Sequence, residues 1–265
     1  MIKFHEKEHK YESECGTKWK SVTAIVKVVQ EPFDGPAIAT KCAKNKKSKW
    51  YGMSPEEILK AWDDISTTAK DLGNWYHAQQ ERLVCELNDI EKEGDVLSIV
   101  KPIYEGDIKH APDQKLENNH IYPEHLCYLK SAGICGQADV IEVRGKKVNV
   151  YDYKTNKELT TSGYVNWQGV TKKLLKPVSH LEDCKLSIYN LQLSLYMYMI
   201  LQHNPHLSSG KLVINHIIFK EIDSDRLGNK AIARDSNGDP IVERVDKYQL
   251  PYLKKEVQAI LKYIK

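Results

Sequence analysis

Residues 136–155 read GQADVIEVRGKKVNVYDYKT, and this stretch decides the fold. Two runs of alternating, strand-forming residues flank Gly145 and Lys146. A glycine in the first central position favours a two-residue turn of type II′. We therefore expect a β-hairpin in which Arg144 faces Lys147, with the rest of the register following from that pair.

The register determines which side chains share a face of the hairpin. Counting outward from the turn gives three facing pairs on one side: Val143 with Val148, Ile141 with Val150, and Asp139 with Asp152. Side chains alternate between the two faces of a strand, so these pairs lie together. The two apolar pairs predict that this is the core side. The third pair brings two carboxylates to its edge, with Cβ atoms about 5 Å apart.

Two facing carboxylates at the edge of a core are unfavourable unless something neutralises them. A divalent cation bound between the oxygens is one solution. Lys154 follows two residues after Asp152 and projects from the same face, where its ammonium could hold a water molecule or a phosphate oxygen. In the other interpretation, Asp139 and Asp152 only mark strand ends and Lys154 is an exposed counter-ion. The pattern alone leaves both interpretations open.

Further helix and strand signals lie on both sides of the hairpin. Ser54, Pro55 and Glu57 form a helix start, and the helix should continue past Gly73 to Leu87. Elsewhere we expect a mixed, irregular segment over 1–50 with an apolar run at 24–29, a loop with one strand over 90–118, and strands over 124–155. Further along, we expect a buried helix over 181–203, a core strand over 211–220, a shorter strand over 241–245 and an amphipathic helix over 251–264. This order indicates one α/β domain with a mixed sheet.

Composition excludes several classes of protein. The 265 residues suffice for one large domain or at most two small ones, and 41% apolar with 28% charged residues is typical of a folded chain. The net charge of +3 is too close to neutral for a polycationic coat, so nucleic-acid binding has to rest on local charge. The longest apolar run, Leu195–Leu201, is far shorter than the roughly 20 residues of a membrane span, and the charged start lacks a signal-peptide core. Transmembrane, secreted and collagen-like proteins are therefore excluded.

The six cysteines predict neither a disulfide framework nor a metal cluster. No two of them are two or three residues apart, so the CxxC spacing of zinc and iron–sulfur sites is missing. We expect reduced thiols in a cytoplasmic protein, with no zinc and no iron–sulfur cluster.

Two further segments join the hairpin in a recognisable order. Residues 73–81 read GNWYHAQQE and residues 192–196 read QLSLY. The hairpin adds Gly136 and Asp139, followed by DYKT at residues 152–155. These four elements, in this order, resemble the signature of RecB-like nucleases in the PD-(D/E)XK superfamily. In that signature, residues 73–81 correspond to a G-x-x-x-H-x-x-x-E helix and residues 192–196 to a Q-x-x-x-Y motif. The segment SVT at residues 21–23 resembles a segment of one branch of this family, the branch that contains the mitochondrial genome maintenance exonuclease and related phage exonucleases.

The resemblance covers residues 21–200 and implies a fold and an activity. It implies a restriction-endonuclease-like α/β core, a central mixed β-sheet flanked by helices, in a single domain over 1–265. Residues 1–53 would be an N-terminal segment that is a candidate for DNA contact, and 54–265 the nuclease core. The implied activity is a Mg²⁺- or Mn²⁺-dependent DNA exonuclease that favours single-stranded ends. The alternatives are a structure-selective endonuclease or a DNA-binding subunit that no longer cuts.

The same resemblance places this activity in DNA replication, recombination or repair. Replication or recombination proteins are the expected partners, low sequence specificity is expected, and no membrane is involved. The compartment would be the cytoplasm, or the host cytoplasm if the chain is viral.

The resemblance also assigns roles to individual residues. Asp139 and Asp152 would bind the metal together with His77 and the backbone carbonyl of Tyr153, and Lys154 would orient the attacking water or help to deprotonate it. For His77, the sequence alone favours a helix-surface histidine paired with Glu81, and the resemblance reverses this preference. Glu81 could either pair with His77 or reach a second metal. Further candidates for the site are Glu81, Glu124, Lys185 and Tyr189.

Three groups of residues are candidates for DNA binding. Gln192 and Tyr196 lie one helical turn apart and would contact the DNA backbone or position the lysine, although a core glutamine bonded to the backbone is the other interpretation. A lysine-rich stretch, which could also be only a solvated loop, combines positive charge with aromatic rings: Lys41, Lys44, Lys46, Lys47, Lys49, Trp50 and Tyr51. A second, similar stretch in the connection over 156–180 holds Trp167, Lys172, Lys173 and Lys176.

Overall fold

A computed structural model describes residues 2–5, 8, 10–13, 18–223 and 230–264. Its helices are α1 (Val22–Lys27), α2 (Gly35–Lys44), α3 (Pro55–Cys85), α4 (Lys185–His203) and α5 (Lys254–Tyr263), with a 3₁₀ turn at Lys130–Ala132. Its strands are β1 (Ile2–His5), β2 (Lys10–Ser13), β3 (Lys20–Ser21), β4 (Asp89–Lys92), β5 (Asp95–Ile99), β6 (Ile103–Glu105), β7 (Ile108–His110), β8 (His120–Leu129), β9 (Ile134–Arg144), β10 (Lys147–Lys154), β11 (Ser208–Phe219), β12 (Glu221–Asp223), β13 (Lys230–Ile232) and β14 (Val242–Leu250).

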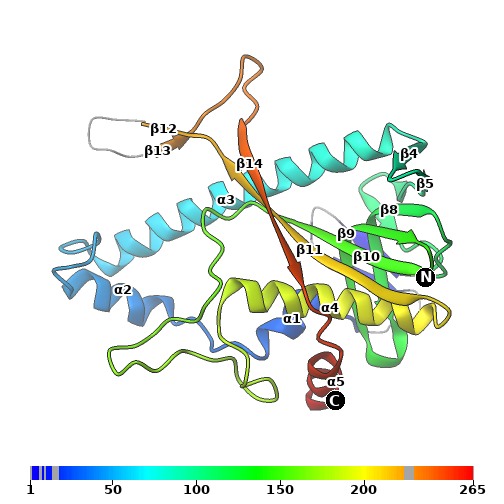
Figure 1. Ribbon diagram of the computed structural model, residues 1–265. Coiled ribbons are helices and arrows are strands. Elements are labelled where there is room, and N and C mark those ends of the chain that lie inside the picture. The colour runs from blue at the N-terminus through cyan, green and yellow to red at the C-terminus, as the bar shows by residue number, and fades with distance from the viewer. Residues whose placement is uncertain (1, 6–7, 9, 14–17, 224–229, 265) are drawn as a thin grey trace.

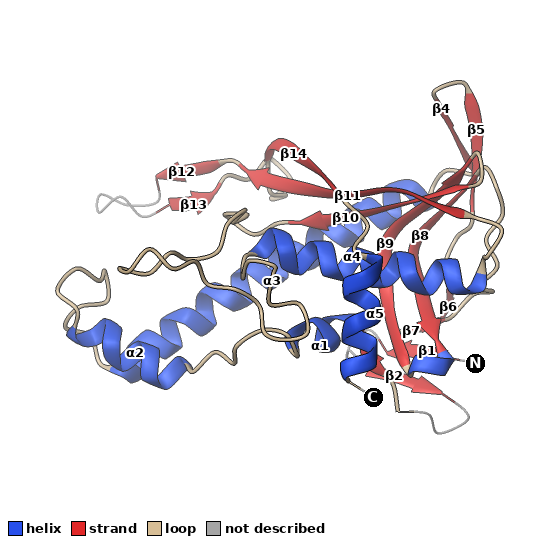
Figure 2. Ribbon diagram, turned by 60° about the horizontal axis from the view of Figure 1, so that its bottom comes forward, coloured by secondary structure: helices blue, strands red, loops and turns tan. Residues whose placement is uncertain are grey.

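A curled, mixed β-sheet forms the centre of the molecule (Figure 1). Its strand order is β14-β11-β10-β9-β8-β5-β4, and β3 pairs with the start of β9. The strands β8, β9 and β10 are antiparallel neighbours, whereas β10 and β11 are parallel. Helix α4 lies along one face with α1 and α5 beside it, and α3 extends from the sheet to α2 (Figure 2). The expected mixed α/β architecture is therefore present.

The central hairpin has the expected register. Val143 pairs with Val148 and Ile141 pairs with Val150, and all four side chains are fully buried. The turn is not of type II′, however, because Gly145 and Lys146 both have positive φ values, 56° and 64°. Positive φ at both central positions is the mark of a type I′ turn. Both turns have two residues, so the wrong turn type leaves the register unchanged.

The long helix α3 begins where the sequence predicts. Ser54 Oγ accepts a hydrogen bond from the Glu57 backbone N–H, and the Glu57 side chain accepts one from the Ser54 N–H, which completes a capping box. The helix then runs without a break through Gly73 and ends at Cys85, two residues before the predicted end. This continuous rod carries residue 77 to the edge of the sheet.

Other boundaries differ from the predictions. The segment expected to be irregular holds β1, β2, β3, α1 and α2, and the segment expected to be a loop with one strand holds β4, β5, β6 and β7. These strands are short, two to five residues each, and some pair with distant strands, as when β1 pairs with β7 and β3 with β9. Such short segments carry too few residues for a clear local pattern. Helix α4 starts four residues later than predicted, and β14 extends five residues further.

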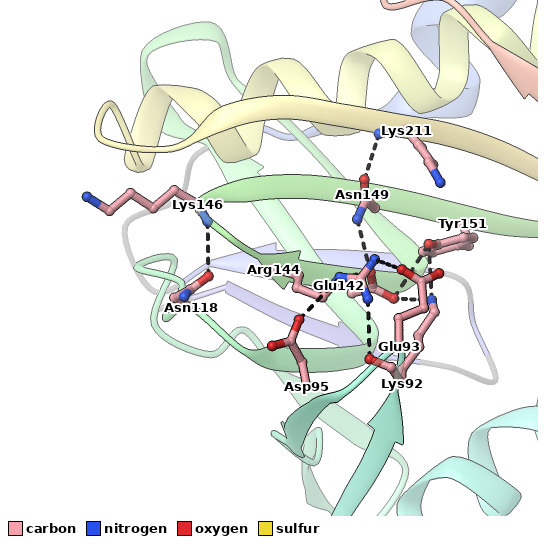
Figure 3. Close-up of polar contacts among 10 residues, drawn as sticks. All are labelled: Lys92, Glu93, Asp95, Asn118, Glu142, Arg144, Lys146, Asn149, Tyr151 and Lys211. Carbon is pink, nitrogen blue, oxygen red and sulfur yellow. Dashed lines mark hydrogen bonds and ion pairs between the residues drawn. The ribbon is translucent and has the colours of Figure 1, made fainter.

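A buried polar network joins neighbouring strands on the other face of the hairpin (Figure 3). The Asn149 amide donates to Glu142 Oε1 at 3.0 Å, and its oxygen accepts the Lys211 backbone N–H at 2.7 Å. Lys92 on β4 forms an ion pair with the same glutamate. A side chain at Gly210 would lie 2.2 Å from the Asn149 oxygen, so glycine is needed there. The network fixes β4 and β11 to the hairpin.

Two expectations about the chain as a whole can be compared with the structure. Within the described residues, no helix combines the length and the hydropathy that a membrane span requires. The five described cysteines are free thiols: Cys42, Cys85, Cys127, Cys135 and Cys184. Cys15 lies outside the described residues.

Candidate metal centre

Three acids lie on three neighbouring strands at the end of the hairpin. Asp139 is on the middle strand, β9. The β8–β9 register on both sides of Glu124 places it opposite Asp139. The last pair between β9 and β10 joins Val140 and Tyr151, so Asp152 is the next residue of β10 after that pair. Glu124, Asp139 and Asp152 are only 5%, 7% and 2% exposed, so three carboxyl groups are concentrated in a buried space.

The backbone at Glu124 is strained. Its φ is +46°, a left-handed conformation that is rare for a residue other than glycine and costs about 1–3 kcal/mol. The conformation turns the side chain toward the Gln137 amide, which donates a hydrogen bond to Glu124 Oε2. Sequence analysis missed Gln137, although it lies within the same motif as Asp139.

His77 reaches the acids from helix α3. Its Nδ1 lies 3.5 Å from Asp139 Oδ1 and 3.7 Å from Glu124 Oε1. The edge of its ring contacts the ring of Tyr153, with ring centroids 5.8 Å apart. One turn further along α3, Glu81 accepts a hydrogen bond from Tyr104 at 2.6 Å. The imidazole is therefore directed at the acids of the sheet.

Lys154 is held beside Asp152. Its Nζ lies 2.5 Å from Asp152 Oδ2 and 4.8 Å from the centroid of the Tyr189 ring. The lysine side chain is only 17% exposed, so the interpretation as an exposed counter-ion is wrong. Tyr189 also donates a hydrogen bond to Asn156 Oδ1 at 3.0 Å, which fixes the ring under the ammonium.

The concentration of charge shifts the pKa values of the centre. Burial, and then the neighbouring Asp152 carboxylate, raise the pKa of Asp139 above its ordinary range. Burial acts to lower the pKa of His77, but the Asp139 and Glu124 carboxylates outweigh it and raise this pKa to about 9. The pKa of Lys154 is also raised, because Asp152 and Asp139 outweigh its burial. The imidazolium and the ammonium thus face three carboxyl groups, one of which resists ionisation.

A divalent cation fits this set of donors. One ligand atom from each of His77, Glu124 and Asp139 lies within 4.8 Å of the others. A single ion with donors at about 2.0–2.4 Å spans such a separation. Asp139 Oδ2 accepts the Tyr153 backbone N–H at 2.7 Å, which leaves Oδ1 directed at the histidine. The carbonyl of Tyr153 as a ligand stays a prediction.

The Q-x-x-x-Y pair lies in helix α4, beneath the hairpin. Gln192 Nε2 donates to Tyr196 Oη at 3.4 Å, and Tyr196 is only 4% exposed. A Cβ at Gly136 would lie 2.8 Å from Tyr196 Cε1, so the glycine of the motif allows the ring to pack against β9. This burial argues against contact of Tyr196 with a DNA backbone, and a role in positioning Lys154 stays a prediction. Lys185, at the start of the same helix, donates to the Glu158 carbonyl at 2.8 Å.

The lysine-rich stretch lies far from the centre. It spans the end of α2 and the turn before α3, where Lys46, Lys47 and Lys49 are exposed. Lys49 Nζ lies 4.6 Å from the centroid of the Trp50 ring. Twenty-three residues of helix separate Ser54 from His77, about 35 Å at 1.5 Å per residue. These lysines are therefore no part of the metal centre.

Comparisons with known proteins add little to this geometry. No protein-family model matches the chain, and no curated protein matches it. A solved structure described as the crystal structure of SSO0001 aligns with 97% of this chain and 78% of its own, at 14% identity and a TM-score of 0.37. A likeness this weak carries no argument about fold or function.

Proposed function

We propose that this protein is a metal-dependent DNA exonuclease with a RecB-like, restriction-endonuclease-like core. The observation that carries the proposal is the buried cluster of Glu124, Asp139 and Asp152 on adjacent strands, with His77 and Lys154 against it. A buried set of like charges is costly in a protein that does not use it. Phosphodiester hydrolysis does use such a set.

Each residue has a role in the proposed reaction. Asp139, Glu124, Asp152 and His77 hold Mg²⁺ or Mn²⁺, since carboxylate oxygens suit both ions and the imidazole nitrogen particularly suits Mn²⁺. The bound ion supplies a water of lowered pKa and neutralises charge on the phosphate. Lys154 orients the attacking water and balances the negative charge that develops on the phosphate. Asp152 keeps that ammonium in place through the 2.5 Å ion pair.

The choice of substrate rests on the sequence resemblance. It favours DNA, single-stranded ends and little sequence specificity. It also favours a role in replication, recombination or repair, together with proteins of those processes.

Cleavage of end-labelled single-stranded DNA and of circular DNA tests the proposal. With Mn²⁺, we expect Lys154→Ala and Asp152→Asn to slow cleavage by at least about 100-fold, the usual effect of losing one charge-stabilising group. Lys147→Ala, an exposed lysine on the same strand, should cut like the parent. Undiminished cleavage by both site variants would remove the assignment.

The same substrates separate the alternatives. Circular DNA degraded as fast as linear strands would indicate an endonuclease. A parent protein that cuts no DNA with either ion would indicate a binding subunit.

A further inference from the structure

An ordered hairpin with an exposed aromatic tip follows the metal centre along the chain. It spans residues 163–172 and begins nine residues after Lys154, in the green connection that leads from β10 to α4 in Figure 1. Four large apolar side chains are exposed on it: Tyr164, Val165, Trp167 and Val170. Trp167 is 90% exposed. Such a cluster lowers solubility and adds nothing to the core, which is typical of a binding surface.

Hydrogen bonds fix the shape of the tip. The Asn166 backbone N–H donates to the Val170 carbonyl at 3.0 Å. The Asn166 side-chain oxygen accepts the N–H groups of Gln168 at 2.9 Å and Val170 at 3.0 Å. Gly169 has a φ of +77°, which the turn requires and glycine adopts readily. Trp167 is therefore presented by a preorganised turn, so binding orders little more than its own side chain.

The base of the hairpin is fixed to the body of the protein. The Gly163 N–H donates to Glu182 Oε2 at 2.9 Å, and a side chain at Gly163 would lie 2.3 Å from the Lys172 carbonyl oxygen. Leu174 and Val178, which follow directly, are buried in the main core. The tip is thus held in a fixed place relative to α4 and the end of β10.

The connection is also basic. Over residues 156–180 it holds four lysines and one acid, a net charge of +3 that equals the net charge of the whole chain. Lys172 is neutralised by Glu31 at 3.2 Å and Asp183 at 2.9 Å. Lys173 and Lys176 are exposed and form no ion pair with any other described residue. The chain segment that directly follows the hairpin therefore carries two lysines with no ion-pair partner among the described residues.

We infer that the hairpin over 163–172 is a stacking site for the bases of a single-stranded nucleic acid. Trp167 and Tyr164 provide the aromatic faces, and Lys173 and Lys176 contact the backbone phosphates. Base stacking together with phosphate contacts binds single strands without regard to sequence. The choice of a nucleic acid over an apolar protein partner rests on these two lysines and on the proposed nuclease function.

Binding of a fluorescein-labelled oligo(dT) of about 20 nucleotides, a length that covers a typical single-strand site, tests the inference. Fluorescence anisotropy in EDTA measures affinity without cleavage. Trp167→Ala should bind at least about fivefold more weakly, the lower end of what one stacked base contributes. Trp167→Phe keeps an aromatic face and should bind within about twofold of the parent. Tyr263→Ala, which removes a similarly exposed aromatic from α5, should change nothing.

Other outcomes would overturn the inference. These are unchanged affinity of Trp167→Ala, or no measurable binding by the parent. Full binding by Trp167→Leu would also overturn it, because leucine keeps apolar surface but has no aromatic face, and would favour an apolar protein partner. Thermal unfolding should be the same in all variants, since the side chain is exposed.

The metal-free assay also separates this inference from the proposed function. If the parent cuts no DNA but Trp167→Ala weakens its binding to oligo(dT), the stacking site is supported and the proposed nuclease function is wrong. If the parent cuts DNA and Trp167→Ala binds oligo(dT) as well as the parent does, the nuclease function is supported and the stacking site is wrong.

Discussion

The negative charge of Asp139 should destabilise the folded protein when no metal is bound. Asp139→Asn removes that charge and keeps an oxygen to accept the Tyr153 N–H. Burial and Asp152 raise the pKa of Asp139, so the folded state binds this proton more tightly than the unfolded state does. The ionised carboxylate therefore costs stability, and the cost grows as the pH rises above the ordinary aspartate range. Each pKa unit of this shift corresponds to about 1.4 kcal/mol, which the variant should gain.

Urea unfolding in EDTA at about pH 5 and about pH 8 measures this gain, which should be larger at the higher pH. Addition of Mn²⁺ at 100 times its Kd should stabilise the parent by about 2.7 kcal/mol and the variant much less, because the variant lacks a charged ligand. Asp63→Asn, at an exposed position of α3, is the matched control and should show neither effect. An Asp139→Asn protein that is less stable than the parent in EDTA at the higher pH would refute the reasoning.

Three further substitutions test other parts of the structure. Gly136→Ala should lower the free energy of unfolding by about 1–3 kcal/mol, because the new Cβ would lie 2.8 Å from the Tyr196 ring. Asn149→Ala should lower it by about 2–4 kcal/mol, since the buried Glu142 loses a hydrogen bond and the partly buried N–H of Lys211 loses its acceptor. Burial lowers the pKa of His125 to about 4. Neutral His125 therefore contributes fully to stability above about pH 6.5, and this contribution, up to about 3 kcal/mol, is lost as the pH falls toward 4. His125→Gln should make stability depend less on pH in this range.

Urea unfolding checks all three, with Lys147→Ala as a surface control. Unchanged stability of Gly136→Ala would mean that the tyrosine ring moves away at no cost. Unchanged stability of Asn149→Ala would mean that water replaces the amide. For His125→Gln, a slope between pH 7 and pH 4.5 equal to that of the parent would assign the acid sensitivity to other groups.

The parts of the fold that the sequence predicts are those set by local rules. A two-residue turn fixes the pairing of Val143 with Val148 whatever its exact type, and the capping box at Ser54 starts α3 without help from tertiary contacts. The acids of the hairpin, Asp139 and Asp152, could be placed for the same reason. These features depend on residues that are close together in the sequence.

The rest depends on contacts between distant segments. The pairing of β1 with β7 joins residues about a hundred positions apart, and the two strands are only four and three residues long. Glu124 was only one candidate among several, because its place opposite Asp139 follows from a strand pairing and from a backbone conformation that no residue type signals. The close contact of the Tyr196 ring with Gly136 likewise becomes evident only when α4 is packed under β9.

The unusual backbone of Glu124 links assembly of the protein to its chemistry. Left to itself, this residue would relax to an ordinary conformation, and its carboxyl group would leave the cluster. The pairing of β8 with β9 on both sides of Glu124 and the hydrogen bond from Gln137 hold it in place. A nascent or partly unfolded chain thus lacks one of the three acids of the candidate metal centre. The proposed nuclease activity would therefore arise only once synthesis and folding are finished.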